Sequence, residues 1–578
     1  MAGKSSGSVI WKNILSNYPG AVLYGLLFNI MLMIDSIIAG LNLGAKGIAA
    51  VALGVPGYGV LAAVIYSLIH GSGLRMIWAK GHSDDRGALR AFNGGATLVG
   101  ISGLVFAVLI FAFADSIILI CGGDMVDTDI RNNAVLYLMF CSPIVFLTAL
   151  GMLLQEVMNV LGYQTARAAL GAINVGVNLT VSILCVVFLP ADMKLAGLGI
   201  GTSAGGLAEF ISGIVILRVM KVHLGYRPLI PRPYEIAETV RCGFPAAADY
   251  FAENVLMGIQ NNLILAGFPG DTMILPTAEV VCNITYFASG TIKGAAIATE
   301  PLFGVFYAER DVKSIRKVWQ QGWVMGMFMS VFWAVLFYVS LPALSALCGM
   351  EMSQDISRGM FLCMIFTPVM HTVCMFTLYY EATRRFTLSM AFAIIPDSCL
   401  YALMMAFLIP IIGKDGIWLA ITGNQVIGLI ILVPLVLFIA AKTGRREDRM
   451  LLLPEEFYTG ADLLEFEIPG DKADVSADLK RLEEPMQSVL SDKELADALL
   501  RYAAELVSEM CKTSKHIHIK LRAEGEKTEL FIHSLGRRFN MPEYTMAHGD
   551  NESVSYSYVY KMNIVCITLT GRCLVKTD

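Results

Sequence analysis

The sequence predicts an all-α polytopic membrane protein that carries a small α+β domain at its C-terminal end. Three observations lead to this fold class. Of the 578 residues, 56% are hydrophobic and only 16% are charged, whereas about a quarter of the residues of an ordinary soluble domain are charged. Long apolar stretches fill residues 18–440, and they contain one unit twice. After residue 442 the hydropathy alternates instead, as it does in half-buried strands.

Twelve apolar stretches have the length of about twenty residues that a helix needs to cross a hydrocarbon core of ~30 Å. They lie near residues 18–41, 48–72, 92–118, 134–158, 168–189, 195–219, 243–267, 276–303, 319–347, 358–382, 388–411 and 416–440. We therefore expect twelve transmembrane helices.

Marker residues of the first six stretches recur in the last six, at offsets of 223 to 227 positions. The pairs are Pro19 and Pro245, Gly71 and Gly294, Asp84 and Asp311, Pro143 and Pro368, and Glu156 and Glu381. Secondary transporters are often built from such repeats, with substrate and ion sites held between the halves. The duplication predicts two pseudo-symmetric six-helix bundles and makes a transporter the leading interpretation.

Basic residues divide unevenly between alternate loops. The N-terminus and every second loop are rich in Lys and Arg, and the other loops hold only Lys46, Arg131, Lys194, Arg358 and Lys414. By the positive-inside rule we expect both termini in the cytoplasm. The first sixteen residues have no small-residue cleavage site, so we expect the first span to stay as an anchor. The predicted location is the bacterial plasma (inner) membrane.

Composition also divides the chain into segments and limits its cofactors. The twelve cysteines form no CxxC pair, which argues against a disulfide framework or a zinc site. We expect no nucleic-acid partner and no cofactor other than a coupling ion. The predicted segments are a cytoplasmic N-terminal segment (1–17), an N-lobe (18–219), a cytoplasmic inter-lobe loop (220–242), a C-lobe (243–441), a linker (442–461) and an α+β domain (462–578).

The tail beyond the linker has the patterns of both strands and helices. The segment LLEFEIP (463–469) alternates like a strand, while residues 472–489 and 492–512 have helical spacing. The segments HIHIKLRAE, TELFIHSL, SVSYSYVY and MNIVCITLT then alternate like strands between turn residues. This order predicts an antiparallel sheet with its helices on one face.

Ionisable residues inside spans are expensive to insert, so each is a candidate site residue. Asp35 lies in the outer half of span 1, and Glu253 lies near the middle of span 7, four residues after Asp249 on the same helix face. Two neighbouring carboxylates repel, so one tends to hold a proton, which it can exchange for a cation. The structural alternatives are a carboxyl of Asp35 satisfied by neighbouring helices and a first-turn position for Asp249.

Other polar residues complete the predicted ion and substrate sites. Asp397 of span 11 is placed opposite Asn178 of span 5 when the two halves are superposed. Asn174 and Asn178 either ligate a cation or hydrogen-bond between helices. We assign ion coupling to Asp35, Asn178, Glu253 and Asp397, and the substrate cavity to Asn174, Asp249, Asn254 and Gln260.

Several charged residues lie near the predicted cytoplasmic ends of spans, where water is close. For Glu156, Glu300 and Glu381 a structural role with basic loop residues is the favoured interpretation. His70 and Lys293 have the same interpretation. Together with Glu300, they are also candidates for a gate at the inner mouth.

The apolar part resembles the multidrug and toxic compound extrusion (MATE) family of the MOP flippase superfamily. The first half does so in MIDSIIAGLNLGAKGIAAVALGVP, QEVMNVLGYQTARAAL and VNLTVSI, and the second in CGFPAAADYFAEN, ATEPLFGVFYAERDV, YYEATRRFTLSM and GKDGIWLA. The resemblance implies two six-helix bundles that rock between inward-open and outward-open states. It also implies export of organic cations, driven by inward flow of protons or sodium.

The resemblance carries over to a few residues of the proposed ion sites. Asp35 matches the family's span-1 coupling aspartate, and Asn178 matches the asparagine of its span-5 motif. Ser182 stands where that motif has an aspartate. Glu253 matches the span-7 glutamate of the sodium-driven branch, whose span-10 aspartate has no counterpart here other than His371.

The tail resembles the ATP-binding fold of histidine kinases and anti-sigma-factor serine kinases. In ELVSEMCK, Glu505 matches a glutamate of that fold, and Glu509 stands where the fold has an asparagine that binds magnesium. In HSLGRRFN, Gly536 and Asn540 fit the adenine loop, whose aspartate is missing. The resemblance therefore implies a degenerate, non-catalytic domain with a regulatory or docking role.

We expect an ion-coupled exporter of organic cations or drugs that works by alternating access among membrane lipids, without enzyme chemistry. A cytoplasmic protein is a candidate partner for the tail. One alternative is a flippase for a lipid-linked oligosaccharide or another amphiphile, whose cavity should hold several cationic residues. Inside the spans such residues are mainly Lys293 and Arg75, both near cytoplasmic ends. The other alternative is a membrane sensor that signals through its tail.

Overall fold

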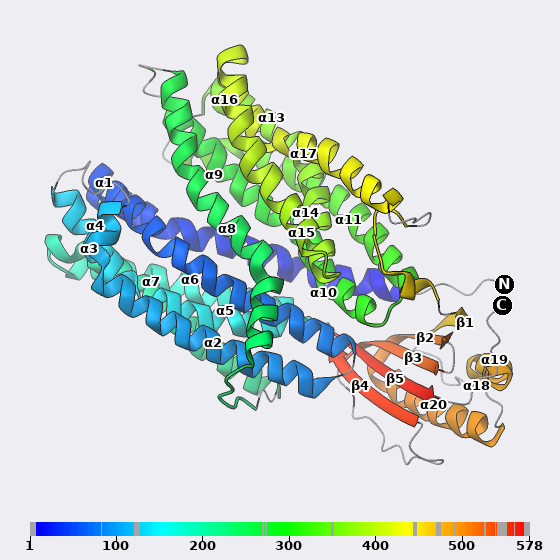
Figure 1. Ribbon diagram of the computed structural model, residues 1–578. Helices are drawn as coiled ribbons and strands as arrows, with labels where there is room; N and C mark the ends of the chain where they lie inside the picture. Colours follow the sequence, from blue (N-terminus) through cyan, green and yellow to red (C-terminus); the bar gives the residue numbers. More distant parts are fainter. Residues whose placement is uncertain are drawn as a thin grey trace.

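Two helical bundles lie side by side, and a small sheet with its own helices lies at one end of both (Figure 1). The structure, a computed structural model, describes residues 7–82, 84–120, 128–222, 225–268, 271, 274–347, 352–442, 448–459, 461–469, 476–489, 493–524, 527–537, 539, 552–559 and 561–570. We call the end of the bundles next to the sheet the domain-side end and the opposite end the far end.

The N-lobe is the bundle formed by the first half of the apolar sequence. It consists of α1 (Gly7–Gly81), α2 (Asp85–Ala112), α3 (Ala114–Ile118), α4 (Thr128–Cys141), α5 (Ile144–Val160), α6 (Gln164–Phe188), η2 (Ala191–Met193) and α7 (Lys194–Val219).

The C-lobe repeats this arrangement. It consists of α8 (Pro233–Gly267), α9 (Ile274–Ile292), α10 (Gly294–Ala308), α11 (Val312–Val339), α12 (Leu341–Leu347), α13 (Gln354–Met364), α14 (Thr367–Ala382), α15 (Phe386–Ile394), the π-helical turn η3 (Ile395–Leu400), α16 (Tyr401–Ile412) and α17 (Lys414–Lys442).

Helix α1 contains two arms that run in opposite directions. Gly294 packs against Val22 and Gly304 against Ile77, so both Val22 and Ile77 contact α10. Helix α10 has 15 residues and is therefore about 22 Å long, whereas a straight helix would separate Val22 from Ile77 by ~80 Å. The chain of α1 must double back, in agreement with the two spans predicted at 18–41 and 48–72. Figure 1 shows the two blue arms.

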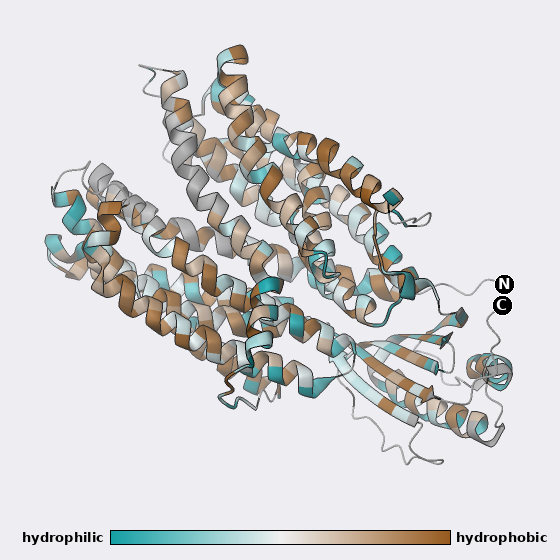
Figure 2. Cartoon of the chain, in the orientation of Figure 1, coloured by the Kyte–Doolittle hydropathy of each residue, from teal (hydrophilic) through white to brown (hydrophobic). Residues whose placement is uncertain are grey.

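The helical lobes confirm the predicted all-α membrane part. In the described part of the chain, seven helices are long and apolar enough to cross a membrane, or nine if each of two bent pairs counts as one span. The full number of twelve stays a prediction, as do the segment boundaries. In Figure 2, brown marks many apolar residues along the helices of both lobes, as expected of a multi-pass membrane protein.

The lipid-facing surfaces follow the sequence repeat. Ile101, Leu104 and Val108 of α2 are among the exposed apolar residues, with exposed fractions of 57%, 55% and 59%. The residues 227 positions later on α11 are Phe328, Val331 and Val335, with exposed fractions of 69%, 53% and 57%. Both helices therefore present an equivalent apolar stripe, at the same offset that relates Asp84 to Asp311.

The duplicated acids and prolines occupy equivalent places in the two lobes. Asp84 caps the N-terminus of α2 by accepting the Gly87 N–H at 2.8 Å, and Asp311 caps α11 by accepting the Ser314 N–H at 3.1 Å. Pro143 lies at the break between α4 and α5. Its counterpart Pro368 lies at the start of α14, after the break that follows α13. Both helix pairs bend by 43°.

The duplicated glycines lie where each lobe receives the first helix of the other. On the second arm of α1, a Cβ atom at Gly71 would lie 1.9 Å from the Thr239 carbonyl oxygen of α8. At the start of α10, a Cβ atom at Gly294 would lie 2.6 Å from the side chain of Val22 on the first arm of α1. Glycine at both positions lets the helices approach this closely, since a side chain at Gly71 would meet backbone and one at Gly294 would meet the Val22 side chain.

The C-terminal domain is a five-stranded antiparallel sheet with strand order β1-β2-β3-β5-β4. Its elements are β1 (Ala461–Pro469), α18 (Ser476–Leu479), η5 (Lys480–Leu482), α19 (Glu483–Val489), α20 (Lys493–Thr513), β2 (Ser514–Glu524), β3 (Lys527–Gly536), β4 (Glu552–Val559) and β5 (Met562–Thr570). The short turn η4 (Glu455–Tyr458) lies in the linker before it.

Strand alternation assigns the two faces of this sheet different roles. Ile517, Ile519 and Leu521 of β2 pack into an apolar cluster with α20 on one face. The intervening residues Lys520 and Arg522 project from the other face and are buried against the membrane helices. The predicted α+β pattern, with an antiparallel sheet and helices on one face, is confirmed.

The close approach at Gly71 makes a test of the lobe interface. Gly71→Ala places a methyl group against a backbone oxygen that cannot rotate away, so we expect a lower midpoint of thermal unfolding in detergent. Gly100→Ala on α2 is the control, because a Cβ there meets no atom within 4 Å. The control should keep or raise the midpoint, since Ala favours a helix by about 1 kcal/mol over Gly. Equal midpoints for the two variants would contradict the close crossing.

Candidate functional site

Asp35 is buried in the N-lobe and is held by hydroxyl groups of two other helices. The Tyr137 hydroxyl of α4 donates to Asp35 Oδ2 at 2.8 Å, and the Thr202 hydroxyl of α7 donates to the same oxygen at 2.6 Å. Asp35 Oδ1 accepts no hydrogen bond within the described part of the protein. One carboxylate oxygen is therefore fixed by neutral donors, and the other is not.

Asn178 of α6 lies next to Asp35, as the predicted ion site requires. Its Oδ1 accepts a hydrogen bond from the Ser182 hydroxyl at 2.9 Å. Its buried Nδ2 has no hydrogen-bond partner among the described residues. Ser182, which stands where the family motif has an aspartate, thus orients Asn178 rather than adding a charge.

Glu209 is a second buried acid of the N-lobe, and it was missed by the sequence analysis. Its side chain is held by two amides, because Gln155 Nε2 donates to Oε1 and Asn174 Nδ2 donates to Oε2, both at 2.6 Å. Asn174 therefore makes the interhelical hydrogen bond that was one of its two predicted roles. Glu209 lies within the predicted span 195–219, so the rule that treats every ionisable residue inside a span as a candidate would have found it.

The two acids share one pair of helices. Asn174 and Asn178 lie one turn apart on α6, and Thr202 and Glu209 lie two turns apart on α7, about 10 Å along the axis. Asp35 is thus next to Asn178 and Thr202, and Glu209, which itself lies on α7, binds Asn174 one turn away on α6. Glu209 also lines a pocket whose other lining residues are Tyr24, Leu27, Thr148, Met152, Gln155 and Gly171.

A different group of buried charges joins the two lobes. His70 Nε2 lies 3.2 Å from Glu381 Oε1 and 3.8 Å from Glu300 Oε1, so an N-lobe histidine contacts two C-lobe acids. Arg167 pairs with Glu156 at 2.7 Å and stacks over the Tyr24 ring at 3.8 Å. Two of the three gate candidates, His70 and Glu300, are therefore together. Their function as a gate stays a prediction.

Lys293 and Asp397 are neighbours in the C-lobe. Lys293 is close enough to Asp397 to interact with it electrostatically, and the Gln425 amide donates to Asp397 Oδ1. Asp397 lies on the π-helical turn η3, a type of widened turn that is frequent at functional sites. The corresponding helix of the N-lobe, α6, has no such turn among its described residues. The two helices therefore differ locally at Asp397, and the pairing of Asp397 with Asn178 stays a prediction.

The remaining predicted residues are only partly covered. The side chains of Asp249, Glu253, Asn254 and Gln260 lie outside the described residues, although their backbone belongs to α8.

For the predicted nucleotide site, Glu505 is exposed on α20, and Glu509 pairs with Lys512 on the same helix. The Gly536 carbonyl accepts the Tyr558 hydroxyl at 3.1 Å. Asn540 lies outside the described residues. The degenerate nucleotide site stays a prediction.

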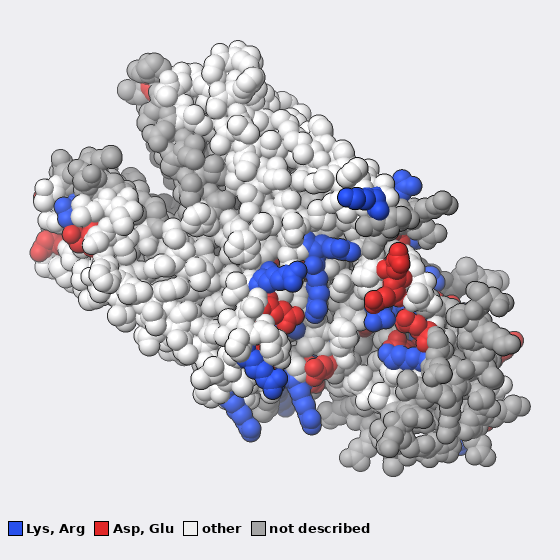
Figure 3. All heavy atoms as spheres, viewed as in Figure 1, with Lys and Arg blue, Asp and Glu red and all other residues white. Residues whose placement is uncertain are grey.

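Charged side chains mark the two ends of the lobes. Figure 3 shows Lys, Arg, Asp and Glu gathered toward the domain-side end, a smaller group at the far end, and an uncharged surface between them. The same view shows a notch that separates the lobes at the far end. At the domain-side end the lobes touch, for example through the Trp78 indole N–H, which donates to the Ala382 carbonyl at 2.8 Å.

A family model described as MatE matches residues 21–187, which cover α1 to α6 including Asp35 and Asn178. Residues 21–187 therefore match the MATE family. The match supports the resemblance predicted from the sequence motifs of the first half, and it indicates a secondary transporter. No curated protein was found to match the chain.

Solved structures show the same fold for the membrane part of the chain. A MATE in complex with MaD3S has a TM-score of 0.67 at 16% identity and covers 75% of this chain and 97% of its own. An outward-facing multidrug resistance MATE transporter of the MOP superfamily has a TM-score of 0.66 at 15% identity, with 77% and 100% covered.

A MOP superfamily transporter from Pyrococcus furiosus Vc1, described as having reverse polarity of its binding pocket, has a TM-score of 0.65 at 15% identity, with 75% and 98% covered. These likenesses confirm the fold of the membrane part. The resemblance of the tail to an ATP-binding fold stays a prediction.

The buried Glu156–Arg167 pair yields a prediction about stability. Glu156→Gln leaves the buried Arg167 charge without its partner, so we expect the free energy of unfolding to fall by about 3–5 kcal/mol. Asp115→Asn breaks the exposed Arg131–Asp115 pair, also at 2.7 Å, and should cost about 1 kcal/mol or less. Unfolding in mixed micelles at increasing denaturant measures both variants. Equal losses of unfolding free energy in the two variants would show that burial does not make the Glu156–Arg167 pair more important for stability than the Asp115–Arg131 pair.

Proposed function

We propose that the protein is a MATE transporter that exports organic cations across the plasma membrane by alternating access, driven by inward flow of protons or sodium. The observation that carries this proposal is the charge balance of the buried acids. The side chains that hydrogen-bond Asp35 and Glu209 are neutral hydroxyls and amides, whereas Glu156 and Glu381 have Arg167 and His70. The N-lobe therefore offers two carboxylates to an incoming cation.

Asp35 is the proposed coupling residue. Oδ1 is the carboxylate oxygen without a hydrogen bond from a described residue, so a proton or a sodium ion would bind there. Neutralising the carboxylate weakens the two hydrogen bonds that Oδ2 accepts, because a charged acceptor binds donors about twice as strongly as a neutral one. These bonds tie α1 to α4 and α7. Binding of the ion thus changes the packing of the N-lobe, and substrate and ion favour opposite states.

Glu209 is the proposed contact for the substrate cation. Its pocket combines a carboxylate with the ring of Tyr24 and the apolar side chains of Leu27 and Met152, which suits a cation that carries apolar groups. A flippase for a lipid-linked diphosphate needs cationic residues instead. The nearby cation is Arg167, which stacks on Tyr24 and is already paired with Glu156. The pocket therefore favours an exporter of cations over the flippase.

The topology of the proposal places both termini, and with them the C-terminal domain, in the cytoplasm of a bacterial cell. At the domain-side end, Lys221 and Arg384 lie in turns, and Arg86 and Lys313 lie in the first turns of α2 and α11. The positive-inside rule assigns this end to the cytoplasm. The sensor alternative and a cytoplasmic protein partner for the tail stay predictions.

Coupling is tested in proteoliposomes by proton or sodium flux that depends on a gradient of an organic cation. We expect Asp35→Asn to abolish this flux, because an amide cannot release a proton or hold sodium by charge. The same measurement with Glu253→Gln tests the second predicted coupling residue. Asp115→Asn, which changes an exposed acid, should retain wild-type flux. Unchanged coupling in both Asp35→Asn and Glu253→Gln would refute ion coupling through these residues.

Substrate recognition is tested by the concentration dependence of transport. We expect Glu209→Gln to raise KM for an organic cation about tenfold, the effect of losing ~1.4 kcal/mol of binding, and to leave KM for a neutral apolar substrate unchanged. An equal change for the charged and the neutral substrate would show that Glu209 does not read the charge. Transport of a lipid-linked oligosaccharide by the wild type would favour the flippase.

A further inference from the structure

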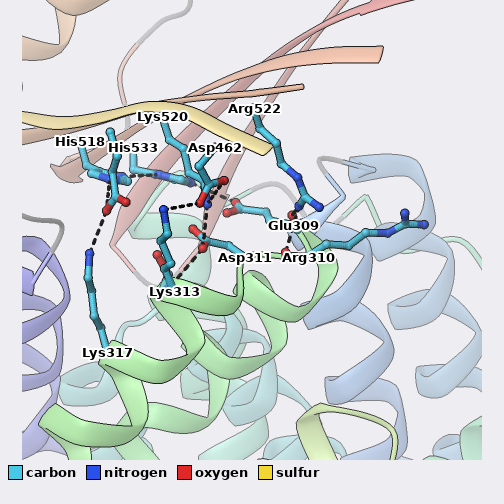
Figure 4. A network of polar contacts seen from close by, with 12 residues as sticks. Glu309, Arg310, Asp311, Lys313, Lys317, Asp462, His518, Lys520, Arg522 and His533 are labelled. Carbon is cyan, nitrogen blue, oxygen red and sulfur yellow. Dashed lines mark hydrogen bonds and ion pairs between the residues drawn. The ribbon is translucent and has the colours of Figure 1, made fainter. Parts of the chain in front are cut away.

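The polar face of the C-terminal sheet is seated on the turn between α10 and α11 of the C-lobe (Figure 4). Lys520 Nζ lies 2.8 Å from Asp311 Oδ1 and 3.0 Å from Asp462 Oδ1, and the Lys520 side chain is only 3% exposed. Burial opposes the charge of Asp311, but the Lys520 ammonium outweighs it and lowers the pKa of Asp311 to about 2. This ion pair is therefore charged at any physiological pH.

The same face also caps the end of α10. The Arg522 guanidinium donates to the carbonyl oxygens of Glu309 and Arg310 at 3.3 and 2.9 Å. Carbonyl groups at a helix C-terminus lack intrahelical partners and attract a positive charge. His533 lies 3.1 Å from Glu309, and Lys317 of α11 lies 2.8 Å from Glu465 of β1. These contacts attach β1, β2 and β3 to the C-lobe.

The linker follows the C-lobe as well. The hydroxyls of Tyr379 and Tyr380 on α14 donate to the carbonyl oxygens of Leu451 and Met450, both at 2.7 Å. Arg385 donates to the Leu452 carbonyl oxygen at 2.8 Å. A linker held at three successive carbonyls does not let the domain move freely.

The other edge of the sheet reaches the N-lobe. In the turn between β4 and β5, the Lys561 backbone N–H donates to the Leu161 carbonyl of the α5–α6 turn at 3.0 Å. The Tyr558 ring lies 6.2 Å from the Tyr163 ring, measured between centroids. The Lys561 ammonium donates to the Ser16 carbonyl of α1 at 3.5 Å. Val559, Met562 and Ile564 are buried in the same apolar cluster as the N-lobe helices.

We propose that the C-terminal domain is a clamp that bridges the two lobes and holds the transporter closed at its domain-side end. The proposal rests on the alternating-access function above, and it adds a regulation to it. Strands β3 and β5 are hydrogen-bonded neighbours, with Leu535 opposite Met562, so the attachments to the two lobes lie on one rigid sheet. The lobes cannot separate at this end while both attachments hold.

The clamp opens on the N-lobe side. The C-lobe attachment contains the buried charges of Lys520, Asp311 and Arg522, and separating buried charged partners is costly. The contacts described on the N-lobe side are a backbone hydrogen bond, a ring contact, apolar contacts and exposed polar contacts. Rocking of the lobes therefore breaks the contact of the β4–β5 turn with the α5–α6 turn and leaves the domain on the C-lobe.

The sequence repeat supplies a matched pair of variants for the test. Asp311→Asn and Asp84→Asn each replace the acid that caps a helix by an amide, which caps about equally well. Asp311 also binds Lys520, whereas Asp84 is exposed and caps α2. Tyr163→Ala is a second variant, which weakens the attachment on the N-lobe side without changing the domain.

The full-length variants are compared in proteoliposomes by initial transport rate and by hydrogen exchange of residues 161–167, which comprise the α5–α6 turn and the first residues of α6. We expect Asp311→Asn and Tyr163→Ala to raise the transport rate about fivefold or more, as a coupling between two sites typically does, and to speed exchange in this segment. Asp84→Asn should match the wild type in both.

The clamp is refuted if Asp311→Asn and Tyr163→Ala leave hydrogen exchange at the α5–α6 turn unchanged, or if Asp84→Asn changes it as much as Asp311→Asn does. Hydrogen exchange does not depend on which substrate is carried. Absence of organic-cation transport in every variant would therefore overturn the proposed function, while the exchange result would still decide whether the domain clamps the lobes.

Discussion

A charge buried among apolar helices has to be met by nearby donors or by an opposite charge, and this requirement organises the polar interior of the protein. Asp35 and Glu209 are met by hydroxyls and amides, so the side chains that hydrogen-bond them bring no positive charge. Glu156 and Glu381 are met by Arg167 and His70, so their charge is used between helices. The type of partner, rather than burial itself, separates candidate binding acids from structural acids.

The duplicated sequence produces two lobes of the same architecture, and the proposed function depends on acids at which the two lobes differ. Equivalent prolines produce equal bends, equivalent glycines receive the opposite lobe, and equivalent apolar stripes face the lipid. The acids at the helix caps are equivalent too, but Asp311 additionally binds the C-terminal domain, whereas Asp84 is exposed. Asp35 and Glu209 both lie in the N-lobe, whereas Asp397 of the C-lobe has Lys293 near it in addition to the Gln425 amide. The helices of the two lobes are thus arranged in the same way, whereas their acidic residues have different partners.

The C-terminal domain adds a constraint that the two lobes alone do not have. Its sheet has one face for its own helices and one face for the membrane part, and strand alternation separates them residue by residue. The polar face contacts the C-lobe, and the β4–β5 turn contacts the N-lobe. A movement of one lobe relative to the other at this end would therefore break or distort one of these contacts. The domain therefore contacts both lobes at the same end of the molecule.

The sequence by itself determined the elements and the repeat. Hydropathy and strand alternation located the helices and all five strands, because both depend on local pattern. Residues such as Pro143, Pro368 and Asp84 act on their own helix, so their structural effect follows from the neighbouring sequence. The motif around Asp35 and Asn178 lies in the part of the chain that matches the MATE family, and the structure brings these two residues together.

Only the tertiary structure decided which residues meet. Glu209 binds Gln155 and Asn174 from two other helices, and Lys520 binds Asp311 across 209 positions of chain (520 − 311). Neither partnership has a local signal, because each depends on how separate elements pack. The difference between the lobes could not be predicted for the same reason. Equal spacing in the sequence gives the position of a residue on its helix, but the partner of its side chain depends on how the helices pack.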